Sequence, residues 1–338
     1  MADPSPNLRY LVLTQLLDKS DKDIEVNELK EERLADPLVK DLIFQQQNDG
    51  SWNPGLILGS DHRTIFQTTC DVLKRLGYLG FNSTYNFVSR GVEFLFRLQN
   101  NDGSWNSSIQ WKDSGNDSRY DWIPLHTALP LRAIVSCGYA EDTRVRKAFD
   151  WLLEKQLPDG AWPTGKAGGG VYGYQAGYRR LPHSRFGCRS NTTGVLSCFA
   201  YHPQLRKIGE IQKAMDHLLS CETKDRMTLG FEVARIMGFE TIGGTLTYFA
   251  KLDQALTLDL CWRIGVSSDD KRLKNILSFI ENEMNEFNLI QYFSKPQATR
   301  WINFDILRSI TNLKMIKEWV SKEPTTPFTR YFRVKKRF

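Results

Sequence analysis

Two histidines and two cysteines lie within twenty residues near the middle of the chain: His183, Cys188, Cys198 and His202. Two His and two Cys side chains are a ligand set of tetrahedral zinc sites. The spacings between them are not standard ones, and Cys198 lies in an apolar run from Val195 to Phe199. A buried free cysteine behaves as a small hydrophobic residue, so the pattern leaves a zinc site and ordinary core cysteines both open.

A second candidate set comes from the glycines that end two apolar segments. Gly138 and Gly265 each precede a short acidic turn, and they are 127 residues apart. Aligning the two glycines makes His126 equivalent to Asp253, each at the start of an apolar helix. Helix N-termini favour anions such as a diphosphate. We therefore predict that both side chains lie at the end of an internal pocket where these helices start.

The candidate catalytic residues are Asp253, His126 and Asp121. The candidate substrate-binding residues add one amide and four aromatic side chains: Asn191, Trp122, Tyr174, Tyr292 and Trp301. Aromatic faces stabilise carbocations as they hold other cations. Each residue also has a simpler interpretation, because an Asp that starts a helix is usually a cap and a Trp at helical spacing is usually core.

A turn that occurs three times has to position these residues. Gln47-Asn48-Asp49-Gly50-Ser51-Trp52 returns as Gln99 to Trp105 with one residue inserted, and again as Gln156 to Trp162. The tryptophans are 53 and 57 residues apart, and self-similarity at a nearly fixed period is typical of an array of packed units. Asp-Gly is a turn dipeptide, and the Trp after it supplies a large apolar surface. Each copy predicts a helix, a tight turn and an aromatic side chain that pins the turn.

Apolar periodicity predicts helices over 8–17, 37–47, 64–76, 88–99, 126–137, 142–156 and 271–284. Five or six helical hairpins result, which favours an all-α closed or solenoidal array. Signals for β-strands are weak. The charged segment Asp18 to Arg33 is expected to be a solvated connection. The segment Gly165 to Gly187, rich in glycine and aromatic residues, is the candidate lid.

The composition restricts the class of protein. Of 338 residues 41% are hydrophobic and 12% are aromatic, as in a globular protein, and the net charge is +6. Because the charge is only mildly basic and concentrates near the C-terminus, we expect no nucleic-acid partner. Six cysteines, mostly in apolar runs, and the lack of a secretory leader predict a cytoplasmic location. No apolar run approaches the roughly 18 residues that a membrane-spanning helix needs.

The repeated Gln-to-Trp turn resembles the QW repeats of the terpene cyclase and protein prenyltransferase superfamily, which includes squalene-hopene cyclases. Two further segments are similar to that superfamily, His126 to Ala133 and Arg300 to Arg308. The second is similar to the final inner helix of prokaryotic single-domain prenyltransferase-like repeat proteins. The resemblance implies an α/α toroid, in which about six helical hairpins form two concentric rings around an apolar central cavity.

Three regions follow from the resemblance. Residues 1–36 are a leading helix and charged connection, residues 37–319 are the α/α toroid, and residues 320–338 are a basic aromatic tail. The tail carries Phe328, Tyr331, Phe332 and Phe338, so it fits either packing against the toroid or peripheral contact with a membrane surface.

The superfamily's two catalytic signatures are both incomplete here. Class II terpene cyclases donate a proton from the middle Asp of Asp-x-Asp-Asp, and the closest segment, Ser267 to Asp270, is interpreted as a helix N-cap. Prenyltransferases bind zinc through Asp-x-Cys and a His. Asp259-Leu260-Cys261 has the spacing, but no His follows His217. We interpret it as an exposed Asp and a core Cys.

The resemblance thus favours a terpenoid cyclase or prenyltransferase-like protein that binds a hydrophobic isoprenoid (polyprenyl) substrate in the central cavity, and it leaves open whether the protein transforms it. The alternative is a non-catalytic toroid that binds a lipid, a small molecule or a protein partner, because fold alone does not determine function. Zinc and magnesium both stay open as cofactors.

Overall fold

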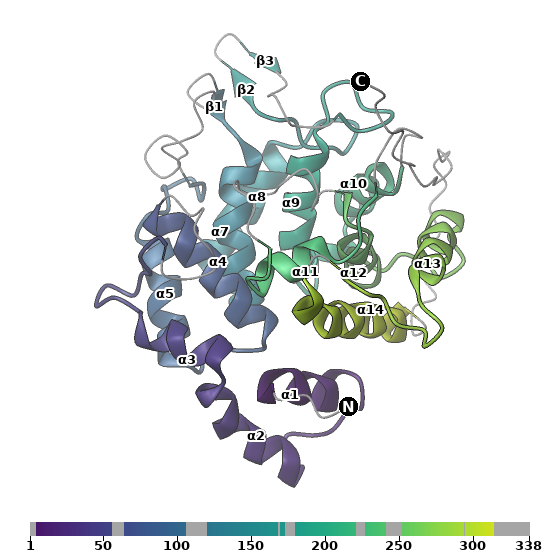
Figure 1. Ribbon diagram of the computed structural model, residues 1–338. Helices are drawn as coiled ribbons and strands as arrows, with labels where there is room; N and C mark the ends of the chain where they lie inside the picture. The colour runs from purple at the N-terminus through teal and green to yellow at the C-terminus, as the bar shows by residue number, and fades with distance from the viewer. Residues whose placement is uncertain are drawn as a thin grey trace, which may run out of the picture.

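The computed structural model describes residues 5–55, 64–105, 120–167, 170–172, 180–220, 227–240, 252–293 and 295–313 (Figure 1). The N-terminal half contains α1 (Pro6–Gln15), α2 (Ile24–Ala35), α3 (Pro37–Phe44), α4 (Ile65–Tyr78), α5 (Asn86–Phe96), α7 (Pro124–Ser136) and α8 (Thr143–Glu154). The C-terminal half contains α9 (Arg189–Phe199), α10 (Gly209–Leu219), α11 (Phe231–Ile236), α12 (Gln254–Ile264), α13 (Lys271–Glu283) and α14 (Thr299–Leu313). No helix within these ranges is long and apolar enough to cross a membrane.

Five helices form the inner layer of the fold. In chain order they are α4, α7, α9, α12 and α14, and each contacts the next. Helices α5, α8, α10 and α13 each follow an inner helix and pack against it from outside. The inner helices are buried almost all round, whereas the outer ones bury one face, as their sequence periodicity predicts. This confirms the predicted all-α class and the α/α toroid.

Helix α11 lies in the middle of the ring (Figure 1). It contacts α4, α12 and α14, which lie on different sides of it. Gly230 before it and Gly238 after it both have positive φ, so the chain turns sharply at each end of this six-residue helix. An open apolar centre was expected, but at the level of α11 the centre is occupied.

Two local expectations differ from the structure. The charged segment before Pro37 is not a solvated connection throughout, because Ile24–Ala35 forms helix α2 and buries Val26, Leu29 and Arg33. Three short strands also occur where strand signals were weak: β1 (Tyr120–Trp122), β2 (Lys166–Ala167) and β3 (Val171–Tyr172) form an antiparallel sheet. The sheet lies within and beside the candidate lid, whose residues 168–169 and 173–179 are outside the described residues. The C-terminal tail also lies outside them.

The repeated turn joins three helices at one corner. At the second copy the Trp105 indole N–H donates to the carbonyl of Leu95 in α5 (2.9 Å), and the Trp105 backbone N–H donates to Thr127 Oγ1 in α7 (3.2 Å). Gln99 Nε2 donates to the Gly103 carbonyl (2.8 Å) and to the Arg144 carbonyl at the start of α8 (3.1 Å). One turn therefore fixes an outer helix, the next inner helix and the next outer helix.

The other two corners repeat these bonds. The indole donors are Trp52 to Leu42 and Trp162 to Leu152, and the backbone donors are Trp52 to Thr69 and Trp162 to Thr192. At the first corner the bridging amide belongs to Gln46, which bonds Gly50 and Phe87, and not to Gln47. Counted from Gln46, the first copy has the same length as the second. The inserted residue inferred from the sequence is therefore wrong.

The glycine of each corner is required for its backbone conformation, and at the first two corners it is also required for a close contact with the next outer helix. Gly50, Gly103 and Gly160 have φ of 91°, 92° and 97°, a region that residues with a Cβ adopt at a cost. A Cβ on Gly103 would also lie 2.5 Å from the carbonyl carbon of Lys147 in α8. The turn thus touches the next outer helix backbone to backbone.

Replacing Gly103 with Ala tests this close contact. Gly265 is the matched control, because it has φ of 100° but nothing within 4 Å of the position of its Cβ. We expect Gly265→Ala to lower the free energy of unfolding by about 1–2 kcal/mol through backbone strain. Gly103→Ala should cost about 1–3 kcal/mol more, because the neighbouring backbone has to move. Urea unfolding of both variants gives the comparison, and equal losses would contradict the close-contact argument.

Candidate functional site

Two groups of charged side chains, buried except for the half-buried Arg263, lie inside the ring. The central cluster comprises Lys74 of α4, Arg132 of α7, and Glu232 and Arg235 of α11. The mouth cluster comprises Asp259 and Arg263 of α12 with Asp305 and Arg308 of α14. Charged side chains are rarely buried unless they are paired, so each cluster is a candidate functional site.

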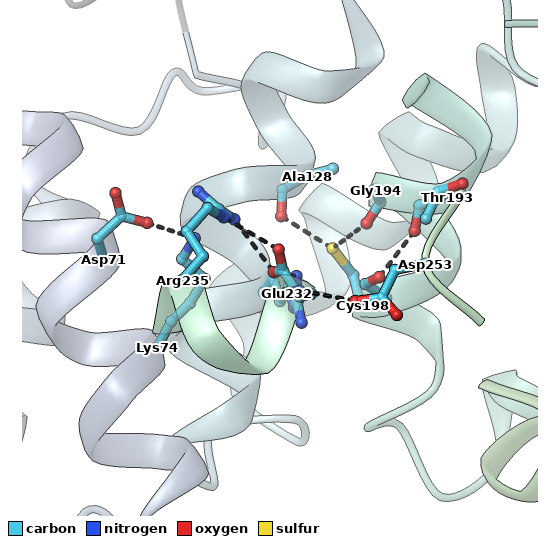
Figure 2. A network of polar contacts seen from close by, with 11 residues as sticks. Asp71, Lys74, Ala128, Thr193, Gly194, Cys198, Glu232, Arg235 and Asp253 are labelled. Carbon is cyan, nitrogen blue, oxygen red and sulfur yellow. Dashed lines mark hydrogen bonds and ion pairs between the residues drawn. The ribbon is translucent and has the colours of Figure 1, made fainter. Parts of the chain in front are cut away.

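Glu232 is the hub of the central cluster (Figure 2). Its carboxylate accepts from Arg132 Nη1 at 2.6 Å and from Arg235 Nε at 3.0 Å. Figure 2 shows Lys74 on α4 facing the same group, with Asp71 beside it as its ion-pair partner. Glu232 is 1% exposed, and burial alone would favour its neutral form. The positive charges of Arg235, Arg132 and Lys74 outweigh that burial and lower the pKa of Glu232 to about 2.

Asp253 fixes the start of α11 from outside that helix. One carboxylate oxygen accepts from the backbone N–H of Gly230 (2.8 Å) and Ala255 (3.0 Å), and the other accepts from the N–H of Glu232 (2.7 Å). Burial raises the pKa of Asp253 to about 7, although these backbone donors oppose the shift. Because both oxygens already accept, Asp253 acts in this structure as a cap that joins α11 to α12.

The mouth cluster is centred on Asp259. One of its oxygens accepts from Arg263 Nε (2.8 Å), and the other accepts from Trp262 Nε1 (3.1 Å) and Arg308 Nη2 (3.2 Å). Burial opposes ionisation, but Arg263 and Arg308 hold the pKa of Asp259 below its usual value. Asp305 pairs with Arg308 as well, yet burial raises the pKa of Asp305 to about 6. The pKa values of Asp259 and Asp305 are thus shifted in opposite directions, which is typical of functional pairs of carboxyl groups.

A pocket of about 410 Å³ opens beside this cluster, and we call it the mouth pocket. It lies where α4, α9 and α12 end and where α14 passes α1. Its lining is largely polar and aromatic: Thr14, Gln15, Asp18, Gly77, Tyr78, Tyr201, Trp262, Arg263, Arg308 and Asn312. The volume is within the range of small-molecule sites.

The predicted polar residues are placed in part as expected. His126 and Asp253 are both buried and both lie at the start of an inner helix, although Asp253 is the cap of α12 whereas His126 is already inside α7. Asn191 is buried, and its side chain accepts from the backbone N–H of Leu125 at the start of α7 (2.8 Å). Asp121 is exposed in β1, so the structure does not bring it to the other three.

The predicted aromatic residues do not form one lining. Trp122 packs edge-on against Trp151 of the outer helix α8 and against Tyr172 of β3. The Tyr292 hydroxyl donates to Glu240 (2.9 Å), and Tyr174 lies outside the described residues. Trp301 is fully buried, with its ring centre 6.3 Å from that of Tyr78. Within the described part of the chain, Trp301 Nε1 has no hydrogen-bond partner.

The candidate metal ligands are engaged elsewhere. Cys198 Sγ donates to the carbonyl of Ala128 in α7 (2.9 Å), and His202 Nδ1 accepts from two backbone N–H groups of the following turn. Cys188 accepts from the Asn191 amide (3.3 Å). Across the described ranges, no group of three or more His, Cys, Asp or Glu side chains is placed to hold a metal ion. The structure therefore does not gather His183 and His202 with the two cysteines.

The contacts also show the roles of the two segments that resemble catalytic signatures, Asp259 to Cys261 and Ser267 to Asp270. Asp259 is not exposed, as the sequence suggested, but is buried and committed to two arginines. Cys261 is a core cysteine, and burial raises the pKa of its thiol. Asp270 caps α13, since it accepts from the N–H of Arg272 (2.8 Å), as predicted for the Ser267 to Asp270 segment.

Sequence reasoning missed Glu232, Arg132, Arg308 and Asp305 as site residues. A usable signal existed for the last two, because Asp305 and Arg308 are oppositely charged residues three apart that flank the apolar pair Ile306 and Leu307. Arg132 also interrupts an apolar run. Its partner Glu232 is one hundred positions away, and no local pattern points to it.

Comparison with known proteins finds a match to one family model over part of the chain. Residues 21–176 match the model of the squalene-hopene cyclase C-terminal domain, and this segment contains all three Trp corners. Squalene--hopene cyclase of Zymomonas mobilis is 26% identical over 145 residues, which cover 41% of this chain and 21% of that enzyme. Lanosterol synthase erg7A of Aspergillus fumigatus is 26% identical over 142 residues, which cover 41% of this chain and 18% of that enzyme. The aligned part is thus about one fifth of these relatives.

Solved structures give looser similarities. A protein from Actinoplanes superposes with a TM-score of 0.46 and 11% identity, covering 91% of this chain and 89% of that one. The type II terpene cyclase MstE from Scytonema, in complex with merosterolic acid A, gives a TM-score of 0.44 and 12% identity over 91% of this chain and 86% of that one.

Removing the charge of Glu232 tests the central cluster. Glu232→Gln leaves buried cations without their carboxylate, and we expect a loss of about 3–5 kcal/mol in the free energy of unfolding at pH 7. Because the folded-state pKa is lowered to about 2, the difference from wild type should hold down to about pH 4.5 and shrink as the pH falls towards 2. Chemical unfolding across this pH range measures it. Asp150→Asn, which breaks an exposed pair with Arg146, should cost no more than about 1 kcal/mol.

Asp305 should give the opposite pH dependence. The groups that face it are Arg308 on its own helix, Asp259 and Arg263 on α12, and Tyr78 on α4. Its raised pKa means that its contribution to stability is fully present below the unfolded value of 3.8 and is lost as the pH rises through about 6. The stability of wild type relative to Asp305→Asn should therefore fall between about pH 4 and 7. A difference that grows with pH would show that Arg308 dominates instead.

Proposed function

We propose that this chain is a member of the terpene cyclase-like superfamily and binds an isoprenoid-derived ligand inside its ring of helices. The observation that carries the proposal is the match over residues 21–176. That segment holds the three Trp corners and the inner helices α4 and α7, which are the parts that shape the ring. The related enzymes are named for squalene and for lanosterol, which are isoprenoid-derived compounds, and we propose the same class of ligand for this chain.

Trp301 is our proposed ligand contact among the described residues. It is fully buried on α14, its ring meets that of Tyr78 on α4, and its indole N–H makes no hydrogen bond within the described ranges. Buried polar groups are normally satisfied, so an unbonded indole N–H in the interior is a place for a ligand atom or a water molecule. Its flat face also suits the contact with an apolar chain.

His126, Asn191 and Asp253 support a polar end for the same ligand, because all three are buried where inner helices begin. A helix N-terminus attracts anionic groups, so an isoprenoid with a diphosphate or another anionic end is the form we propose there.

Binding without turnover is the second candidate, and one observation favours it. Both oxygens of Asp253 accept hydrogen bonds from backbone N–H groups. The predicted catalytic acid is therefore held as a helix cap. A proton donor needs a carboxylic acid whose O–H reaches the substrate.

Direct ligand binding and product analysis separate these candidates. The purified full chain is incubated with geranylgeranyl diphosphate, geranylgeraniol and squalene, and with the unbranched octadecanol as a control. We expect saturable binding to at least one isoprenoid, at least tenfold tighter than to octadecanol. Mass spectrometry of the extracted ligand then reports turnover. Equal binding of octadecanol, or no isoprenoid binding, would contradict the proposal.

Two variants check the place of binding. Trp301→Leu keeps an apolar side chain but removes the indole, and we expect its isoprenoid affinity to fall at least fivefold. Phe44→Ala removes an aromatic side chain that is 87% exposed on α3, so it should leave the affinity unchanged. Thermal melting of both variants establishes that they fold.

A further inference from the structure

We propose that the mouth pocket is a second binding site, which takes a small organic oxyanion, a carboxylate or a phosphate ester with an apolar or aromatic part, through Arg263. The pocket lies where α4, α9 and α12 end, whereas His126 and Asp253 lie where inner helices begin. Tyr78 both lines the pocket and contacts Trp301, so the two proposed sites adjoin at this residue.

Arg263 is held in one orientation by its surroundings. Its Nε donates to Asp259 at 2.8 Å. Its guanidinium carbon lies 4.5 Å from the centre of the Tyr201 ring and 4.4 Å from that of Trp262, and both aromatic residues line the pocket. Aromatic faces hold a guanidinium by cation–π attraction and stacking. The guanidinium group of Arg263 is therefore positioned before any ligand binds, which reduces the conformational entropy lost on binding.

The end of Arg263 is available to a ligand. Among the described residues neither Nη atom of Arg263 has a hydrogen-bond partner, although the residue lines the pocket and its side chain is only 13% exposed. The two Nη groups of a guanidinium present parallel donors that match the oxygens of a carboxylate or phosphate. The free donors and the fixed stem together make a built oxyanion receptor.

Two more guanidiniums increase the positive potential here. Arg308 lines the pocket, and its Nε is buried without a hydrogen-bond partner in the described part of the protein. Arg206 lies close by, since burial first and then the charge of Arg263 lower the pKa of Arg206. Its Nε likewise has no partner within the described ranges. Guanidinium groups placed together attract an anion, and nearby carboxylates reduce that attraction.

In the described part of the chain, three carboxylates oppose the three guanidiniums here, so the unbonded Nη donors of Arg263, and not a net positive charge, favour an anion. Asp259 is already shared between Arg263 and Arg308, and Asp305 is paired with Arg308. Asp18 lies on the pocket wall and would favour a cation. The helix C-termini that meet here also carry partial negative charge. A cationic ligand is therefore the sharpest alternative, and the test includes it.

The rest of the lining sets the size and character of the ligand. Tyr78, Tyr201 and Trp262 supply aromatic surface, while Gln15 and Asn312 supply amides. Gln15 Oε1 accepts from Arg308 Nη1 (3.2 Å), so this amide is oriented as well. A volume of about 410 Å³ holds a single aromatic ring with its anionic group.

Three probes of the same shape and different charge test the proposal. Phenyl phosphate is the anion, benzyl alcohol the neutral analogue and phenethylamine the cation, each titrated calorimetrically into the full chain. Inorganic phosphate and benzoate distinguish a requirement for phosphate from a requirement for any oxyanion. We expect binding of phenyl phosphate or benzoate at least tenfold tighter than of benzyl alcohol, and weakened by salt. Preference for phenethylamine, or equal binding of all three, would overturn the proposal.

Variants assign the binding to Arg263. Arg263→Gln should weaken binding of the anionic probe at least tenfold, and Arg263→Lys should recover only part of it, because an ammonium lacks the fork. Arg146→Gln removes an exposed arginine of the outer helix α8 and should change nothing. Thermal melts identify a variant that fails to fold, and Tyr201→Leu then provides a second test by removing the stack with Arg263 intact. Isoprenoid binding should be unaffected by Arg263→Gln, so failure of either proposal is seen independently.

Discussion

The Trp corner is the constraint on which this fold depends. Each indole N–H is buried, and it can be satisfied only if the preceding outer helix presents one particular carbonyl, ten residues earlier in all three copies. The backbone N–H of the same Trp reaches a threonine of the next inner helix. Because an unmade hydrogen bond at a buried group costs about 1–3 kcal/mol, the corners leave each hairpin little freedom against the next. Curvature of the ring is thus set locally, corner by corner.

The charges in the middle follow from how the ring is filled. Helix α11 has only six residues and cannot bury enough apolar surface to hold itself in place. It is held instead by Glu232, which meets cations from α4, α7 and its own helix, and by Asp253, which ties its backbone to α12. A buried ion pair gives little net stability, but it disfavours wrong registers strongly, because each displaced partner leaves a buried charge unpaired. The cluster therefore specifies where α11 lies more than it strengthens the fold.

The parts that sequence could predict are those whose cause is local. The outer helices, the glycines at positive φ and the Asp caps were readable, because each depends on residues within one turn. The bridging role of Gln46 was not, because Gln46 and Gln47 are adjacent and only the distance to Gly50 distinguishes them. The burial of Asp259 and the outward packing of Trp122 were missed for a related reason. Each is determined by partners far along the chain, Arg308 for the first and Tyr172 for the second.

The separation of the corners from the interior explains how this architecture keeps its shape while its chemistry varies. Corner residues contact helix backbones and one threonine each, and the bonds that define a corner do not involve the central or mouth clusters. Interior residues can therefore change without disturbing the ring, provided that every buried charge finds a partner. In this chain the interior holds ion pairs at the level of α11 and arginines with aromatic rings at the mouth. The corners thus set the scaffold, and the interior is the part that can vary with the chemistry of recognition.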